Sequence, residues 1–172
     1  MNKALRTLCR YILLLAVVLL AYTNTFYKVF FSITAYPIKF LLLLFYDAEL
    51  SYSTLYIGDT VIDLIPACIA VSAYVLLIIL NLTTEIKPRI RVYSLLFSLL
   101  SLLILNILRV FVLTILLVND FVYFEAVHKF FWYGLSTVFV VAIWFLTAYL
   151  FKIKNIPAYG DFLNIKKEIK RK

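Results

Sequence analysis

Three side chains that can take part in covalent chemistry lie in the apolar part of this chain: Cys68, Arg109 and His128. A cysteine thiolate is a nucleophile, a nearby histidine can take up the thiol proton, and an arginine can stabilise the oxyanion that forms when a carbonyl carbon is attacked. The planar fork of arginine can also recognise a peptide carbonyl or a carboxylate. If the fold brings these side chains together, they are sufficient for acyl transfer through a thioester.

Arg109 is the only charged residue between Val92 and Val118. An arginine within a membrane span costs several kcal/mol unless a partner or a water-filled cavity receives it, so its position marks a candidate functional site. Asn106, three residues earlier, lies on the same helical face and can orient the guanidinium or its ligand. The alternative is that Arg109 snorkels to the nearer interface, roughly 13 Å of helix away at Val118.

Cys68 and His128 each have a structural alternative. Cys68 is expected one turn into a helix over 66–82, where the positive end of the helix dipole stabilises a thiolate, but cysteine is also often buried as an inert side chain. His128, the only histidine, begins the last expected span, where it can simply anchor the helix at the interface. Cys9 lies at the cytoplasmic end of the first expected span and is interpreted as structural. Because there is no CxxC motif, we expect no metal and no cofactor.

The composition is that of an integral membrane protein. Of the 172 residues, 65% are hydrophobic and 15% are charged, with a mean hydropathy of +1.02, whereas soluble domains are roughly half apolar and a quarter charged. The net charge of +8 comes mainly from basic residues at both chain ends and in a loop at 87–91. This distribution is typical of cytoplasmic flanks and not of a nucleic-acid-binding face. We therefore expect both termini in the cytoplasm and no nucleic acid as a partner.

The elements that must position these side chains form, on this interpretation, an all-α integral membrane helix bundle. We expect a single domain over 1–172 with about four transmembrane helices, an interfacial helix and a small outer β-hairpin. The expected segments are span 1 (8–31), the interfacial helix (33–46), the hairpin (47–65), span 2 (66–82), span 3 (92–118), span 4 (127–151) and a basic cytoplasmic tail (152–172).

One of these segments is assigned by its length, and another by its alternation of apolar and polar residues. Segment 33–46 is too short to cross a bilayer, so it is expected to lie along the outer surface. Segment 47–65 alternates apolar with polar residues around Gly58-Asp59, which predicts a hairpin with its turn at that dipeptide. Short connections make successive spans packing neighbours, which places the cysteine, the arginine and the histidine in the outer halves of three adjacent spans.

The order of Cys68, then Asn106-Ile107-Leu108-Arg109, then a histidine at the head of the last span resembles the exosortase/archaeosortase family of membrane-embedded cysteine transpeptidases. The resemblance covers roughly 33–151. The short core and the Ile-, Leu-, Lys-, Tyr- and Asn-rich composition are most similar to the small archaeal form called pacearchaeosortase. One departure follows the cysteine, where the family commonly has a small polar residue and glycine and this chain has Ile69-Ala70.

The resemblance implies an enzyme that cleaves secreted proteins carrying a carboxy-terminal sorting signal, made of a short motif, an apolar span and a basic cluster. Cys68 would attack the scissile carbonyl, His128 would act as acid and base, and Arg109 would stabilise the oxyanion or orient the substrate. The acyl group would pass from a thioester to an amine, plausibly of a lipid, or to water. The site would lie at the outer face of the cell membrane.

Two other classes of protein compete with this interpretation. A non-catalytic membrane assembly factor or transporter subunit would use Arg109 to pair with a carboxylate of a partner, and Cys68 would then be replaceable. An intramembrane protease of another mechanism is disfavoured, because no Gly-x-Ser-x-Gly, paired intramembrane aspartates or His-Glu-x-x-His occurs in the chain.

Overall fold

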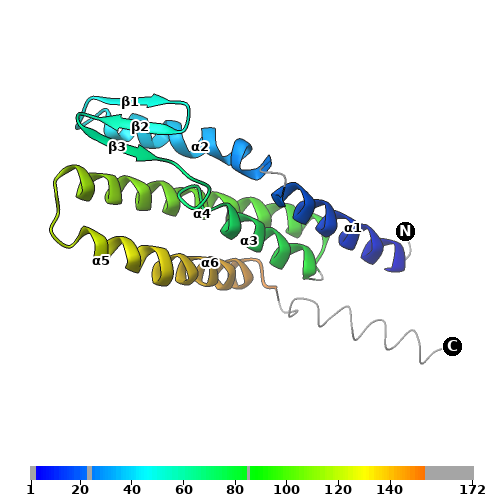
Figure 1. Ribbon diagram of the computed structural model, residues 1–172. Coiled ribbons are helices and arrows are strands. Elements are labelled where there is room, and N and C mark those ends of the chain that lie inside the picture. The colour runs from blue at the N-terminus through cyan, green and yellow to red at the C-terminus, as the bar shows by residue number, and fades with distance from the viewer. Residues whose placement is uncertain (1–2, 23–24, 85, 154–172) are drawn as a thin grey trace.

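The computed structural model describes residues 3–22, 25–84 and 86–153. Within these ranges the chain is mostly helical, with a small three-stranded antiparallel sheet (Figure 1). In chain order the elements are α1 (Lys3–Tyr22), α2 (Thr25–Leu42), β1 (Ala48–Ser51), β2 (Thr54–Ile57), β3 (Thr60–Asp63), α3 (Val71–Thr83), α4 (Pro88–Val118), α5 (Phe124–Lys129), the π-helical segment η1 (Phe130–Leu135) and α6 (Ser136–Leu150).

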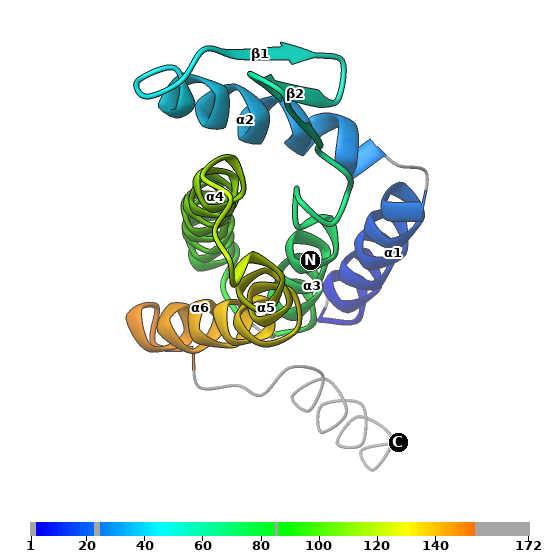
Figure 2. The same cartoon turned by 60° about the vertical axis from the view of Figure 1, so that its left-hand side comes forward.

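Helix α4 is the longest of the described helices, and α2, α3, α5 and α6 pack against it. Its 31 residues begin with Pro88, whose missing N–H and fixed φ suit the first helical position. Figure 2 shows α2 and the sheet on one side of α4 and α6 on the other. The predicted third span, 92–118, therefore lies within this helix and ends with it at Val118.

Among the described helices, α4 alone is long and apolar enough by itself to cross a membrane. A second crossing is obtained if the pair Phe124–Gly134 and Ser136–Leu150, which bends by 40°, is counted as one span. By length and composition, the described helices thus include one candidate span, or two if the bent pair is counted as one, whereas the sequence predicted about four. Helix α3 has only 13 residues because it begins at Val71 and not at Pro66.

The first expected span differs in its boundaries as well. Residues 8–31 fall on two helices, since α1 ends at Tyr22 and α2 begins at Thr25. The predicted interfacial helix over 33–46 is the second half of α2, which ends at Leu42 and contains Pro37. Of the predicted basic tail, 152–172, only the first two residues lie within the described part of the chain.

The small sheet confirms the predicted turn and extends the predicted hairpin by one strand. Gly58 has a φ of 55°, which suits glycine in the turn that joins β2 to β3. Strand β1 pairs with the other side of β2, so the sheet order is β1-β2-β3. Alternate side chains face one side of a strand, and here Leu55 and Ile57 of β2 are buried in a cluster that includes Ile38 and Leu42 of α2.

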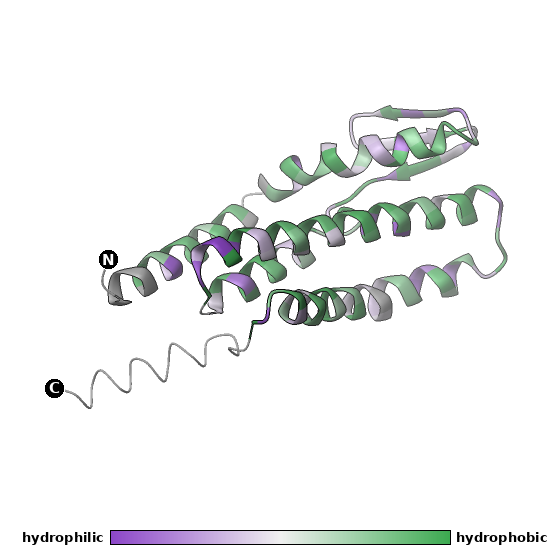
Figure 3. Ribbon diagram, turned by 180° about the vertical axis from the view of Figure 1, so that it is seen from behind, coloured by the Kyte–Doolittle hydropathy of each residue, from purple (hydrophilic) through white to green (hydrophobic). Residues whose placement is uncertain are grey.

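Polar pairs between helices hold the opposite end of the bundle. The amide of Asn81 on α3 donates to Oγ of Ser94 on α4 at 2.8 Å, and the hydroxyls of Ser98 on α4 and Thr147 on α6 lie 3.0 Å apart. Figure 3 shows that apolar residues predominate along the helices, and many large apolar side chains are exposed, among them Leu96, Leu100 and Ile104 of α4. Large exposed apolar surface of this kind fits contact with lipid. Polar pairs buried between helices are also typical of helix bundles in a bilayer.

Candidate active site

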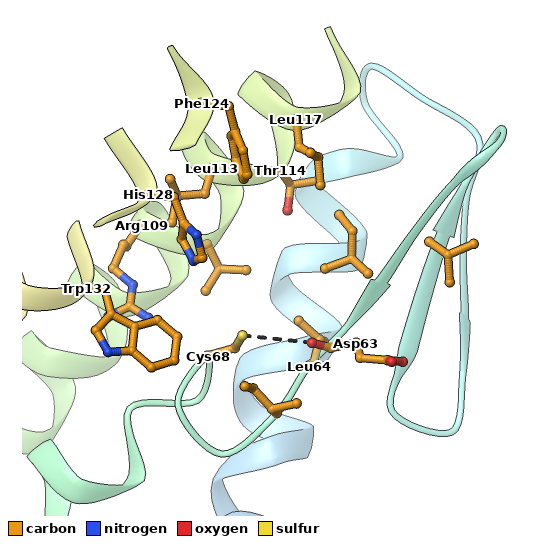
Figure 4. Close-up of a pocket in the computed structure, with 14 residues that line it drawn as sticks. Asp63, Leu64, Cys68, Arg109, Leu113, Thr114, Leu117, Phe124, His128 and Trp132 are labelled. Carbon is orange, nitrogen blue, oxygen red and sulfur yellow. Dashed lines mark hydrogen bonds between the residues drawn. The ribbon is translucent and has the colours of Figure 1, made fainter. Parts of the chain in front are cut away.

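A cavity of about 320 Å³ lies between the sheet, α4 and α5. Its lining includes Cys68, Arg109 and His128, which come from three segments far apart in the sequence (Figure 4). The remaining lining is largely apolar, with Trp132 on the side of η1 and residues of β3 on the side of the sheet. The structure thus brings the three predicted side chains into one cavity near the end of α4 that connects to α5.

Cys68 does not lie in a helix, contrary to the prediction. It belongs to a turn segment before α3, in which its own N–H donates to the carbonyl of Ile65 at 2.9 Å. Helix α3 begins only at Val71, after Cys68, because Ala70 has a φ of 58°, in the left-handed region. The helix dipole that was expected to stabilise a thiolate therefore begins beyond the cysteine.

The surroundings of the thiol favour its neutral form. Burial raises the pKa of the Cys68 thiol above its ordinary value, although a backbone hydrogen bond and the positive charge of Arg109 act in the opposite direction. The sulfur lies 3.9 Å from the carbonyl oxygen of Asp63 at the end of β3. A nucleophile in this position needs a base to take up its proton, because only the thiolate is strongly nucleophilic.

Arg109 is held inside the bundle by two hydrogen bonds to its own chain. Nη1 donates to Oγ of Ser136 at 2.8 Å, and Nη2 donates to the carbonyl of Ala67 at 3.1 Å. The guanidinium therefore lies at the cavity and does not snorkel to the interface. In the described part of the chain no carboxylate pairs with it, so the positive charge of the cavity is not neutralised.

Asn106 has a different partner from the one that its spacing suggested. Its side-chain amide donates to the carbonyl of Cys68 at 2.9 Å, and the residue is buried. One helical turn later, Arg109 binds the carbonyl of Ala67. Helix α4 thus holds two consecutive carbonyls of the turn segment, and this pair of contacts fixes the backbone on which the thiol stands.

His128 lies in α5 and is oriented by aromatic contacts. Its ring stacks on Phe124, with centroids 5.5 Å apart, and meets Trp132 edge to face at 5.8 Å. Figure 4 shows the imidazole directed into the cavity on the side of Cys68. Neither ring nitrogen forms a hydrogen bond with the described residues, so both remain available for proton transfer.

Ser136 is a site residue that the sequence analysis missed. It accepts the hydrogen bond of Arg109 and donates its own proton to the carbonyl of Phe131, five residues earlier, at 2.7 Å. The five-residue step belongs to η1, a π-helical segment of the kind often found at functional sites. The signal in the sequence was Gly134 in an otherwise bulky helix, which favours a local irregularity of the backbone.

Comparison with known proteins adds no assignment to this geometry. No family model, no curated protein sequence and no solved structure matches the chain. Among the described residues, no three His, Cys, Asp or Glu side chains form a group that could hold a metal ion. The chemistry of the site has to be argued from its own residues.

Proposed function

We propose that the chain is a membrane-embedded cysteine transpeptidase of the exosortase/archaeosortase type that cleaves the carboxy-terminal sorting signal of secreted proteins. The observation that carries this proposal is the single cavity that collects Cys68, Arg109 and His128. A nucleophile, a base and a cation are the three groups that acyl transfer through a thioester needs. They come from the turn segment, α4 and α5, which are separated widely in the sequence.

In the proposed reaction, His128 takes the proton of the Cys68 thiol, and the sulfur attacks the scissile carbonyl carbon. The carbonyl π electrons move to oxygen, and Arg109 stabilises the resulting oxyanion. The intermediate collapses when the amine leaves with a proton from His128, so that the acyl group remains on sulfur as a thioester. An amine of an acceptor, such as a lipid headgroup, then attacks the thioester, and its proton returns through His128 to the thiol. Water in place of the amine gives hydrolysis.

Arg109 is prepared for this task before a substrate binds. Guanidinium has five N–H donors, of which two are used by Ser136 and Ala67; the Nε–H is buried without a partner, and one N–H on each Nη remains for a ligand. Because the two internal bonds hold the group in place, little reorganisation is needed when the oxyanion forms.

The backbone at Ala70 gives independent support for the family resemblance. This residue stands two positions after the cysteine, where the resembled family commonly has glycine. Its φ of 58° lies in the left-handed region, which glycine adopts freely and alanine only at a cost of roughly 1–2 kcal/mol. The turn that presents the thiol therefore has the backbone shape that a glycine at this position would favour.

The proposal includes four spans, cytoplasmic termini and a cavity at the outer face. The basic loop at 87–91 and the sheet lie near opposite ends of α4 (Figure 1). Because basic loops stay in the cytoplasm, the proposed orientation has the sheet and the cavity outside.

This orientation is tested by single cysteines in a variant without Cys9 and Cys68. Tyr52 is 97% exposed in the sheet, and Arg89 is exposed at the start of α4. We expect Tyr52→Cys to react with a membrane-impermeant maleimide on intact cells and Arg89→Cys to react only after the cells are opened. Labelling of Arg89→Cys on intact cells would contradict the proposed orientation.

The activity is tested with a secreted reporter that carries a candidate sorting tail. The tail is taken from a protein of the same genome that ends in a short motif, an apolar span and a basic cluster. The reporter is co-expressed with the chain, and loss of its tail is followed by mass. Cleavage that requires the chain, and that depends on Cys68, supports the proposal.

Ser136 is expected to contribute by holding Arg109. Ser136→Ala removes a hydrogen bond to a charged group, which corresponds to a loss of about 10- to 100-fold in the rate of reporter cleavage. Thr137→Ala is the matched control, because Thr137 is exposed and its hydroxyl donates to the carbonyl of Tyr133, four residues earlier, at 3.4 Å and not to Arg109. Equal rates for the two variants would show that the bond to Ser136 has no role in catalysis.

A further inference from the structure

Strand β3 has a free edge, and this edge runs along the cavity. The sheet order β1-β2-β3 leaves one side of β3 without a neighbouring strand from the described part of the chain. Five consecutive residues, Val61 to Ile65, line the cavity. A strand that faced the cavity with one side of its pleat would contribute alternate residues only. The unbroken run therefore means that the cavity follows the edge of β3 and the chain leading from it (Figure 4).

The register shows which main-chain groups this edge presents. The N–H of Leu64 donates to the carbonyl of Ser53 at 2.8 Å, which marks that pair as hydrogen-bonded in the register of β2 and β3. Bonded and non-bonded pairs alternate along an antiparallel ladder, so the main-chain groups of Val61 and Asp63 point away from β2. No other described element hydrogen-bonds to the amides of these two residues.

The row of edge groups ends at the nucleophile. The carbonyl of Asp63 is the last of them. Its oxygen accepts the N–H of Ile65 at 3.1 Å, and the sulfur of Cys68 lies 3.9 Å from it. Across the cavity, the wall formed by α4 and α5 presents apolar side chains, among them Leu113, Leu117 and Phe124. The main-chain groups of Val61 and the N–H of Asp63 therefore lie beside this apolar wall without a partner among the described residues, as on an exposed strand edge.

We propose that the β3 edge binds the substrate as an added strand, an inference that rests on the proposed function. An extended peptide segment with apolar side chains pairs through its main chain with Val61 and Asp63 and packs its side chains on the wall of α4 and α5. The segment runs parallel to β3, from the end of the bundle that holds the sheet toward Cys68 (Figure 1). Its next carbonyl carbon then meets the sulfur.

The test uses a small probe in place of the natural substrate. Acetyl-Val-Val-Val chloromethyl ketone carries three apolar residues on the amino side of an electrophilic carbon. The sulfur of Cys68 displaces chloride from the methylene carbon, a thioether forms, and the thiol proton passes to His128. The full chain in lipid nanodiscs, with Cys9→Ser, is alkylated with this probe, and the rate is divided by the rate for iodoacetamide, which senses the thiol without strand pairing.

Three further probes each carry one methylated valine amide. In an added strand, alternate amides point toward β3, so we expect methylation to slow alkylation by about tenfold at alternate positions and to have a smaller effect between them. Equal rates for all four probes would overturn the proposal. Such a result leaves the proposed function standing if reporter cleavage still requires Cys68, whereas cleavage without Cys68 removes the function whatever the probes show.

A variant of the strand tests the same pairing from the side of the protein. Val61→Pro removes an N–H that points away from β2, which is the position where proline is tolerated on an edge strand. We expect the normalised rate of the unmethylated probe to fall by about tenfold, and to fall less in Val61→Ala, which keeps the N–H. Equal losses in both variants would assign the effect to the side chain and overturn strand pairing. If Val61→Pro does not insert into the membrane, the methylated probes decide alone.

Discussion

Cys68→Ala is expected to abolish cleavage of the reporter tail, with a loss of more than about 1,000-fold, while the amount of protein in the membrane stays the same. The contacts of Cys68 that hold the turn segment are made by its main chain, through its N–H to Ile65 and its carbonyl to Asn106. Alanine keeps both contacts, so the substitution removes the nucleophile without removing the structure. The measurement compares reporter mass in membranes that contain equal amounts of each variant.

Two variants accompany this experiment as controls. Cys68→Ser is expected to be nearly inactive, because an alcohol ionises far less readily than a thiol. Cys9→Ala is expected to cleave at the wild-type rate, since Cys9 is exposed on α1 and does not line the cavity. Normal cleavage by Cys68→Ala would refute the transpeptidase proposal and favour the assembly-factor alternative.

Arg109→Lys is expected to lower the rate of cleavage by roughly 100- to 1,000-fold, the usual effect of removing one preorganised oxyanion donor. Lysine keeps the positive charge but replaces a planar fork with a single ammonium group. One ammonium cannot span the carbonyl of Ala67 and the hydroxyl of Ser136 and still present a fixed donor to the oxyanion. If the charge alone mattered, most of the activity would remain.

The matched control for this substitution lies on the same helix. Arg89→Lys makes the identical chemical change at an exposed position at the start of α4, so it is expected to leave cleavage and insertion unaffected. Asn106→Ala is expected to be milder than Arg109→Lys, because Asn106 holds the backbone of Cys68 and does not contact the reacting atoms. Near-wild-type cleavage by Arg109→Lys would leave a cysteine–histidine pair as the catalytic set.

Features that depend on a short stretch of chain could be predicted from the sequence. The apolar run up to Val118, in which Arg109 is the only charged residue, predicted a long helix over 92–118, because a run of that length with apolar residues on all sides is typical of a buried or membrane-spanning helix. Gly58-Asp59 predicted the β2–β3 turn, since only a few residue types adopt a positive φ without strain. The isolated charge of Arg109 marked a candidate functional site, because an arginine in a membrane span is costly unless a partner or a water-filled cavity receives it.

Helix boundaries depended on contacts that no short stretch contains. Pro66 suggested a helix that starts before Cys68, yet the chain stays in a turn until Val71. The turn is held by Asn106 and Arg109 of α4, which are 38 and 42 residues away from the carbonyls that they bind. The local preference for helix was overridden because these distant donors bind the carbonyls in a non-helical arrangement.

The sequence by itself determined the apolar character of the chain, the central helix and the identity of the three side chains that line the cavity, because composition, apolar run length and an isolated charge are local properties. Only the tertiary structure decided that Ser136 accepts a hydrogen bond from Arg109 and that the end of β3 lies beside the sulfur of Cys68. Hydrogen bonds between distant segments have no periodicity in the sequence. They become visible only when packing has placed the donors beside their acceptors.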